Sequence, residues 1–553
     1  MNRPTAPALS RRNLFKGTAL GIAALGTGPL LAACSGSGAG AAASGDIAAL
    51  PSYLPITKGP KPDLKGNASV QPVYYRAPAE SELFRSVASK PGTGGRLSAF
   101  VVTYYSPPPA NNSYLKYISG QVGTSFDMQL VPGDSYASKF ATMTAGGDLP
   151  DLVQFLTFAP PQGGPQLLQA KFQDLSAYLS GDKVKKYPNL ANLSEASWAS
   201  ARVNGRIYGV PEPRPPFGSI LVCRPDLIEK LTGQEPAPKN EADFTELCKQ
   251  VTSERANRYA ICGQGGGGSV EWGFDFFAAM FGVPNGWKLK GGKLVNKYET
   301  DEWLRTISYI KKLRGAGYYH PDTPSLENSR AKTYVANGTV LMHMDGISSL
   351  LDITLPKGVV TGAVVPFGAD GGKGANYQGP SSFGFTAMKK ADKKKIEEQL
   401  AVLDYLAAPY GSQEYFKLRN GQDGVHFRRD GRDVELTKAG RTMVEPTTLF
   451  RIAEGPQVLT STIRIDEQLR RSHAWQVASQ DMLVQNPVQG LYSETASRSA
   501  SATTSLTDTF TSYILGRADL GAVKSAISSW KSSVGDATRD EYTRQLDKQS
   551  AAS

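Results

Sequence analysis

The N-terminal end of the chain carries residues whose order specifies a covalent modification. Leu31-Ala32-Ala33-Cys34 is a run of small residues that ends in a thiol, and it follows an apolar stretch rich in glycine and alanine. The paired arginines Arg11 and Arg12 stand before that stretch. This order predicts a twin-arginine export signal and lipoprotein signal peptide over residues 1–33, whose removal leaves Cys34 as a lipidated first residue. The apolar stretch is too short and too glycine-rich to be a membrane-spanning helix, which needs about 20 apolar residues.

The other thiols and the histidines lack the spacing that catalysis or metal binding requires. Three cysteines remain, Cys223, Cys248 and Cys262, so at most one disulfide can form, and the pair nearest in sequence is Cys248 with Cys262. Three buried thiols that pack as small apolar groups are the equally open alternative. The four histidines lie far apart, outside any metal-ligand spacing or nucleophile motif. We expect no catalytic residue, no metal and no cofactor.

The charge balance argues against a nucleic-acid-binding protein. The 553-residue chain has a formal charge of +11, which falls to +7 without residues 1–33, because that segment holds four cations and no acidic residue. The excess is spread without blocks of like charge and without basic residues interleaved with aromatics. Attraction to anionic ligands stays open. The length predicts two or more lobes rather than one core.

Both strands and helices are predicted along this chain, and together they must position any functional site. Apolar runs at residues 97–105, 126–131 and 152–155 predict strands, and residues 136–144 between them predict a helix. Alternating strands and helices indicate an α/β fold. Helices are also expected after the capping residues Asn240 and Thr300, after residue 395, and through the Ser/Thr/Ala-rich end beyond residue 493.

Residues 34–95 are predicted to stand outside the folded lobes. Residues 35–45 contain only glycine, alanine and serine, a composition typical of a flexible tether. Seven prolines between residues 46 and 95 prevent long regular elements. We expect this segment to be a linker or an extended arm that lies on the body.

Several segments together resemble the extracellular solute-binding lipoproteins of ABC importers, in the branch that handles sugars and oligosaccharides. Their order and spacing cover most of residues 97–549. They are Gly147-Asp148-Leu149-Pro150-Asp151, Asn204-Gly205-Arg206-Ile207-Tyr208-Gly209-Val210-Pro211, Cys223-Arg224-Pro225-Asp226-Leu227, Gly286-Trp287-Lys288, Tyr334-Val335-Ala336-Asn337-Gly338 with Met342-His343-Met344-Asp345-Gly346, and Gly411-Ser412-Gln413-Glu414 with Gly421-Gln422-Asp423-Gly424.

The resemblance implies a two-lobed, periplasmic-binding-protein-like (type II) fold with discontinuous lobes and a ligand cleft between them. The N-terminal lobe is expected to comprise residues 96–212 plus 367–450, and the C-terminal lobe residues 213–366 plus 451–553. The chain is then expected to cross between lobes near residues 211–214, 364–368 and 444–455. Related proteins often carry a calcium loop where this chain has residues 252–259, but one carboxylate and two arginines there make structural calcium doubtful.

Sugars present apolar C–H faces and rings of hydroxyls, so a site for them needs aromatic platforms and planar polar groups. Positions that match the family's cleft are candidates for these roles: Phe155, Tyr208, Glu212, Arg214, Glu271, Trp272, Asp345 and Trp475. Several of them have a structural alternative. Phe155 and Trp272 can be core residues, Arg214 can pair with Glu212 rather than with an acidic sugar, and Asp345 can form a turn.

The resemblance implies a monomeric, lipid-anchored protein on the outer face of the membrane that captures an oligosaccharide or other sugar and delivers it to ABC transporter permease subunits. Nucleic acid is not expected as a partner. Two alternatives remain open at this point: a secreted carbohydrate-active enzyme, such as a lyase or glycosidase, and a peptide-binding protein of the same fold.

Overall fold

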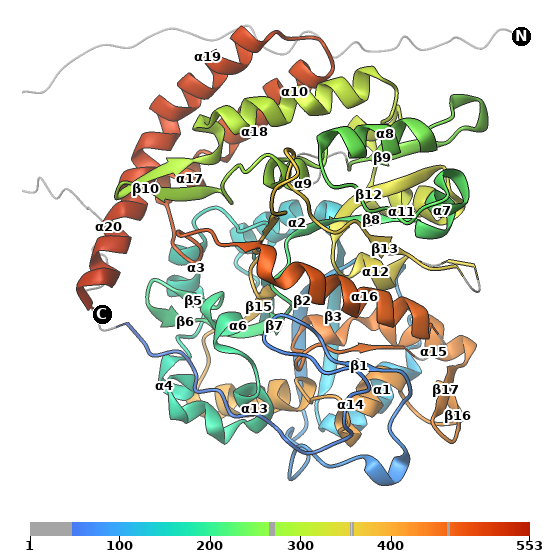
Figure 1. The fold of residues 1–553 in the computed structure, drawn as a ribbon. Helices are drawn as coiled ribbons and strands as arrows, with labels where there is room; N and C mark the ends of the chain where they lie inside the picture. Colours follow the sequence, from blue (N-terminus) through green and yellow to red (C-terminus); the bar gives the residue numbers. More distant parts are fainter. Residues whose placement is uncertain (1–46, 265–270, 354, 357–358, 462–464, 553) are drawn as a thin grey trace, which may run out of the picture. The chain divides into compact units, whose positions relative to one another are not determined.

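A computed structural model describes residues 47–552, except residues 265–270, 354, 357–358 and 462–464 (Figure 1). The predicted signal peptide, the lipidation at Cys34 and the glycine loop at residues 265–268 lie outside the described residues.

The first lobe is built on a five-stranded mixed sheet with the order β3-β2-β4-β15-β7. Strands β2 (Arg96–Thr103), β3 (Ser125–Pro132) and β4 (Leu152–Leu156) run parallel. Strand β15 (Ser382–Met388) is antiparallel to β4 and to β7 (Gly209–Pro213). The predicted strands are therefore present, although the first ends at Thr103, two residues earlier than expected.

Side-chain alternation along β2 divides the first lobe into two apolar layers. Ala99 and Val101 pack with α1 (Ser113–Val122) and α13 (Lys393–Leu406) on one face. Phe100 and Val102 pack with α2 (Gly133–Gly146) on the other, because successive side chains of a strand point to opposite faces. Helices thus cover both faces of this sheet, as expected for an α/β fold.

The second lobe contains a four-stranded sheet with the order β13-β8-β12-β9. Its strands are β8 (Ser219–Cys223), β9 (Tyr259–Cys262), β12 (Val340–Gly346) and β13 (Gly362–Ala363). Helices α8 (Glu241–Val251), α10 (Asp301–Gly315), α18 (Ala500–Ile514) and α19 (Leu520–Trp530) contribute to the larger core beside it. The side chains of Asn240 and Thr300 accept the capping hydrogen bonds of α8 and α10, which confirms both predicted helix starts.

The chain passes between the two sheets in three places. It leaves the first sheet after β7, enters the second at β8, and returns to the first at β15. The first two crossings are hydrogen bonded side by side, since the backbone N–H of Arg214 donates to Ser381 and that of Gly218 donates to Tyr377. Phe367 and Tyr377 still pack in the second core, so we propose that the return follows Tyr377 rather than the expected residue 367.

The third crossing leads from η7 (Leu449–Arg451) to α16 (Asp466–Ser479), which packs on the second lobe. Residues 47–95 form the expected extended arm; its regular elements are β1 (Val73–Tyr74) and η1 (Glu80–Glu82). Backbone hydrogen bonds fasten the arm to the body, for example from Leu54 to Ala191 at 2.7 Å.

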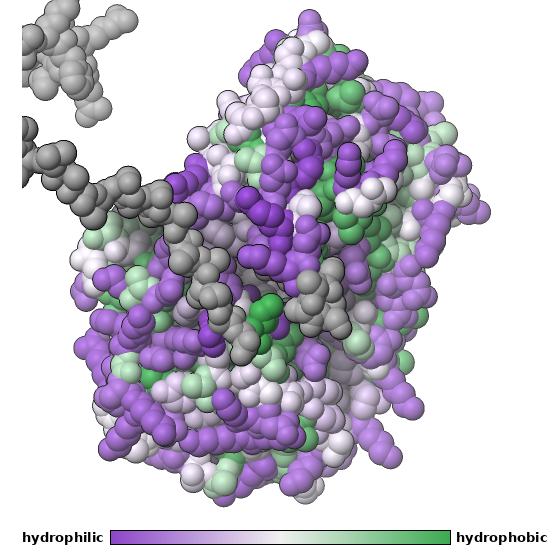
Figure 2. Space-filling model, turned by 90° about the vertical axis from the view of Figure 1, so that its left-hand side faces the viewer, coloured by the Kyte–Doolittle hydropathy of each residue, from purple (hydrophilic) through white to green (hydrophobic). Residues whose placement is uncertain are grey.

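The molecular surface is mainly polar on the face that Figure 2 presents. Hydrophilic residues cover most of that face, and apolar residues form small, separate areas. Throughout the described part of the chain, each helix is too short or too polar to cross a membrane.

Candidate functional site

At one edge of the five-stranded sheet, the residues that follow several of its strands lie close together. Strands β2, β4 and β7 end at this edge, and β15 begins there, because Ser382 pairs with Pro213 and Gly384 pairs with Leu156. Ligand sites of open α/β sheets lie at such edges, where loops after several strands converge.

Aromatic side chains gather at this edge. Tyr104 follows β2 and is 56% exposed, and Phe158 follows β4 and is 59% exposed. Both lie beside Phe383 at the start of β15, with ring centres 6.5 Å and 5.1 Å from its ring centre. Exposed rings next to a buried one form a platform suited to the C–H face of a sugar.

Two arginines lie against the same platform. The guanidinium carbons of Arg214 and Arg451 are each 3.9 Å from the centre of the Phe383 ring. Arg451 donates to the carboxylate of Glu212, whereas the guanidinium of Arg214 has no ion-pair or hydrogen-bond partner among the described residues. Burial and the charge of Arg451 lower the pKa of Arg214, so an anionic partner would stabilise this cation.

Glu212 is tied into the sheet beneath the platform. It is 2% exposed and accepts a hydrogen bond of 2.9 Å from Gln154 Nε2, while Gln154 Oε1 accepts one of 3.0 Å from the backbone of Val102. Burial raises the pKa of Glu212, against the attraction of Arg451 and Arg214. The carboxylate therefore links β4 and, through Gln154, β2 to Arg451. Its oxygens are engaged in these contacts and are not free to accept hydrogen bonds from a ligand.

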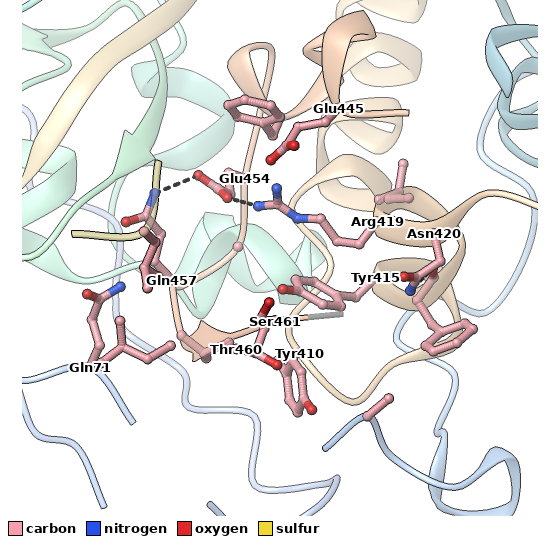
Figure 3. Close-up of a pocket in the computed structure, with 18 of the residues that line it drawn as sticks. Gln71, Tyr410, Tyr415, Arg419, Asn420, Glu445, Glu454, Gln457, Thr460 and Ser461 are labelled. Atoms are coloured by element: carbon pink, nitrogen blue, oxygen red, sulfur yellow. Dashed lines mark hydrogen bonds and ion pairs between the residues drawn. The ribbon is translucent and has the colours of Figure 1, made fainter. Parts of the chain in front are cut away.

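A cavity of about 500 Å³ adjoins this edge. Its walls come from the first lobe, from the second lobe at Ile347, Ser348 and Asp352, from the third crossing and from the arm. Figure 3 shows Arg419 and Gln457 converging on Glu454 inside it, with Tyr410 and Tyr415 nearby. Aromatic rings, amides and hydroxyls line one partly open cavity, which is the composition of a small-molecule site.

Acidic residues in the cavity are shifted toward their neutral forms. Burial raises the pKa of Asp352, partly offset by Lys332, and burial raises the pKa of Glu445, partly offset by Arg419. Asp352 comes from the second lobe and also lies within electrostatic reach of Arg214. The cavity thus brings a carboxyl group of the second lobe within electrostatic reach of a cation that follows β7 of the first lobe.

The structure brings Glu212 and Arg214 to this site, but it places Phe155 and Tyr208 in the core of the first lobe. The Phe155 ring stacks on Phe385 at 5.3 Å and is 3% exposed. Tyr208 precedes β7, so it lies at the opposite end of that strand from Arg214. Phe155 thus occupies the core alternative that the sequence left open, whereas the burial of Tyr208 was not anticipated.

Trp272 and Glu271 belong to the packing of the second lobe. Trp272 is 1% exposed, its Nε1 donates to Thr511 Oγ1 at 3.0 Å, and its ring lies 5.5 Å from that of Tyr319. The same Thr511 hydroxyl donates to Glu271 at 2.7 Å. In this conformation neither side chain lines the cavity.

Asp345 and Trp475 also have structural roles. Asp345 accepts hydrogen bonds from Asn328 Nδ2, from Ser349 Oγ and from the backbone of Gly346, so it builds the turn after β12. Burial alone would raise the pKa of Asp345, but the neighbouring His343 and Lys332 and the hydrogen bond from Ser349 lower it. Trp475 on α16 is 4% exposed and donates to the carbonyl of Val364 at 3.1 Å.

Tyr104 and Phe158 were not predicted from the sequence as platform residues. Phe155, which lies within a predicted strand, was predicted instead. Tyr104 was visible as the last aromatic of the first apolar run, and Phe158 lies three residues beyond Phe155. Within a strand, side chains alternate between the two faces of the sheet, and a sheet covered on both faces buries them. A residue just after the strand is not held in this alternation and can be exposed. Arg451 gave no local signal, since it reaches the platform from a distant segment.

Neither a disulfide nor a metal site is formed within the described ranges. Cys223, Cys248 and Cys262 are free and buried, so of the two possibilities that the sequence left open the structure has three packed thiols and no Cys248–Cys262 bridge. No group of three metal-ligating side chains occurs in the described chain. In the segment of residues 252–259, where structural calcium was doubtful from the sequence, Arg258 Nε donates to the carbonyl of Val251 at 2.8 Å, which places a cation beside that oxygen.

Comparison with known proteins points to one family. A model described as "bacterial extracellular solute-binding protein" matches residues 120–421, more than half of the chain. The polygalacturonan/rhamnogalacturonan-binding protein YtcQ of Bacillus subtilis (strain 168) is 23% identical over 82% of this chain and 91% of its own length. Lipoprotein LipO of the same organism is 22% identical over 78% of this chain and 88% of its own length.

Solved structures share the fold. The substrate-binding protein FusA of S. pneumoniae, an ABC-transporter component solved in complex with kestose, superposes with a TM-score of 0.59 at 13% identity. The match covers 84% of this chain and all of that one. This agrees with the two lobes described above.

Proposed function

Because the chain belongs to the bacterial extracellular solute-binding proteins, we propose that it captures an oligosaccharide between its lobes and delivers it to an ABC permease. The observation that carries the proposal is the platform of Tyr104, Phe158 and Phe383, because the two arginines that lie against it, Arg214 and Arg451, also line the cavity. Stacking on the exposed rings and hydrogen bonding inside the cavity are complementary to a sugar's two kinds of surface.

We further propose that the preferred saccharide is acidic. The unpaired guanidinium of Arg214 supports this, because a planar donor fork matches a uronate carboxylate. The name of the relative YtcQ, which binds polygalacturonan and rhamnogalacturonan, points the same way. Phe383 would hold the guanidinium flat while the carboxylate approaches its edge.

The protein is proposed to act as a monomer held to the outer membrane face through a lipid on Cys34 and to leave its ligand chemically unchanged. The predicted twin-arginine signal and lipid attachment site support the first part, and the relative LipO is named a lipoprotein. The absence of a nucleophile motif in the sequence supports binding without conversion.

Isothermal titration of the mature protein tests the proposal with three probes: trigalacturonate, the neutral trisaccharide kestose and an unrelated tripeptide. We expect binding of trigalacturonate, weaker binding of kestose and none of the peptide. Chromatography of the recovered sugar should return it intact. Binding of the peptide alone would overturn the saccharide class, and new reducing ends or unsaturated products would overturn the binding-only function.

A further inference from the structure

The N-terminal arm touches the first lobe at both of its ends. At its start, the backbone N–H of Ala48 donates to Gly205 at 2.8 Å. At its other end, the backbone N–H and the hydroxyl of Ser86 both donate to Glu414, at 2.9 Å and 3.0 Å. The arm therefore leaves the first lobe and comes back to it.

The middle of the arm is fastened to α16 of the second lobe. The backbone N–H of Gln71 donates to Gln476 Oε1 at 2.8 Å, and Gln476 Nε2 donates back to Gln71 Oε1 at 3.0 Å. Asn67 Nδ2 donates to Gln480 Oε1 at 2.9 Å. Figure 1 shows the arm, in blue, running beside α16 at β1.

Apolar contacts support the same attachment. Val73 is fully buried against Leu459 of the third crossing and Leu469 of α16. Strand β1 pairs in parallel with β18 (Leu459–Thr460). On the next residue, the Tyr74 ring stacks on Tyr410 of the first lobe with ring centres 4.1 Å apart.

Arg76 joins the two lobes through a single side chain. Its guanidinium makes a two-pronged pair with Asp466 at the start of α16, at 2.8 Å and 3.1 Å. Its Nε also lies 3.9 Å from Asp433 of β17 (Asp433–Leu436), a hairpin strand of the first lobe. The Arg76 carbonyl accepts from Tyr410 Oη at 3.0 Å, which fixes the backbone on the first-lobe side.

The arm also walls the cavity, since Gln71, Tyr75 and Arg76 line it together with residues of both lobes. A rotation of α16 relative to Tyr410 must stretch or break the contacts of Arg76 and Gln71. The arm thus connects the two lobes, so a change in the interlobe angle has to change the arm's contacts.

We propose that residues 47–95 act as a strap across the hinge, and that the Arg76–Asp466 pair is the clasp that holds the lobes at the angle described here. Loss of the clasp widens the range of interlobe angles and lowers the fraction of molecules in this conformation. The proposal requires the two-lobed fold but not the identity of the ligand.

Distances between spin labels on the two lobes test the strap without ligand. Labels at Lys183→Cys in the first lobe and Lys524→Cys in the second are read by pulsed electron resonance, in the mature chain with Cys34→Ser. The native thiols are buried and stay unlabelled. In Arg76→Ala we expect a broader distance distribution, with its mean shifted by about 2 Å or more, the scale of hinge rearrangements.

Asp466→Asn opens the clasp from the opposite side and should change the distribution in the same way. Arg96→Ala is the matched control, because it removes an exposed ion pair with Asp127 inside the first lobe. Thermal melts establish that each variant is folded, and Asp466→Asn replaces Arg76→Ala if the latter is not. Distributions identical to the parent in both clasp variants would overturn the strap, and so would an equal change in Arg96→Ala.

Discussion

The guanidinium carbon of Arg214 lies over the ring of Phe383, 3.9 Å from the ring centre. A guanidinium carries its N–H donors in a fixed planar fork, which a carboxylate can accept in pairs. Arg451 lies at the same distance from the ring, but it is committed to Glu212. One aromatic ring therefore orients two cations, of which Arg214 is the one without a partner in the described chain.

Arg214→Ala is expected to weaken trigalacturonate binding by about 10- to 100-fold, because hydrogen bonds between charged groups contribute about 1.5–3 kcal/mol. Kestose should lose much less affinity. Titration calorimetry on both sugars measures the difference. Arg214→Lys keeps the charge without the fork and should fall between the parent and Arg214→Ala; equal losses for both sugars would contradict recognition of the carboxylate.

Removal of an exposed ring from the platform should weaken both acidic and neutral saccharides. Tyr104→Ala and Phe158→Ala are each expected to cost about 0.5–1.5 kcal/mol of binding, or roughly 2- to 10-fold in affinity. Their melting temperatures should barely change, because both side chains are more than half exposed. Tyr53→Ala on the arm removes a similarly exposed ring as the control, and a parallel loss in that variant would argue against a specific platform.

Trp272→Ala should act on stability rather than on affinity. The indole is 1% exposed in the second core, and truncation of a buried aromatic typically lowers the free energy of unfolding by about 3–5 kcal/mol. Denaturant unfolding measures that loss, and calorimetry on the folded variant should give nearly the parental affinity. A large drop in affinity with little change in unfolding would instead identify Trp272 as the ligand contact predicted from the sequence.

Asp404 is expected to make stability depend on pH. Its Oδ1 accepts backbone hydrogen bonds from Asn189 and Leu190 at 2.8 Å and 3.0 Å, and burial raises its pKa from 3.8 to about 7. The native state thus binds this proton more tightly than the unfolded state does. Its contribution is full below about pH 4 and is lost as the pH rises toward 7.

Urea unfolding at pH 5 and pH 8 tests this effect. The parent should lose more stability over that interval than Asp404→Asn, which keeps an acceptor oxygen but has no proton to lose. Asp547→Asn replaces an exposed carboxylate and serves as the control. If the free energy of unfolding falls by the same amount between pH 5 and pH 8 in the parent and in Asp404→Asn, Asp404 is not the source of the pH dependence.

The sequence predicted the elements well because their signals are local. Asn240 and Thr300 mark helix starts through hydrogen bonds to residues three positions ahead. Strands β2 and β3 were visible as apolar runs. Discontinuous lobes and three crossings could not follow from such patterns and were expected only through the resemblance.

The candidate site was harder to predict because it depends on contacts between distant segments. Phe383, Arg214 and Arg451 meet although more than 160 residues separate Arg214 from Phe383 in the chain. The aromatic types of Phe155 and Trp272 fit a platform, yet burial, which composition does not reveal, decides their role. Glu212 and Arg214 were expected only because their positions match the family's cleft near the first crossing.

Burial of the three thiols affects how they react with oxidants. Burial raises the pKa of Cys223 to about 12 and that of Cys248 well above its usual range, so almost no thiolate exists at neutral pH. The thiolate is the species that oxidants and disulfides attack. Burial therefore protects these three thiols from oxidation in the folded chain.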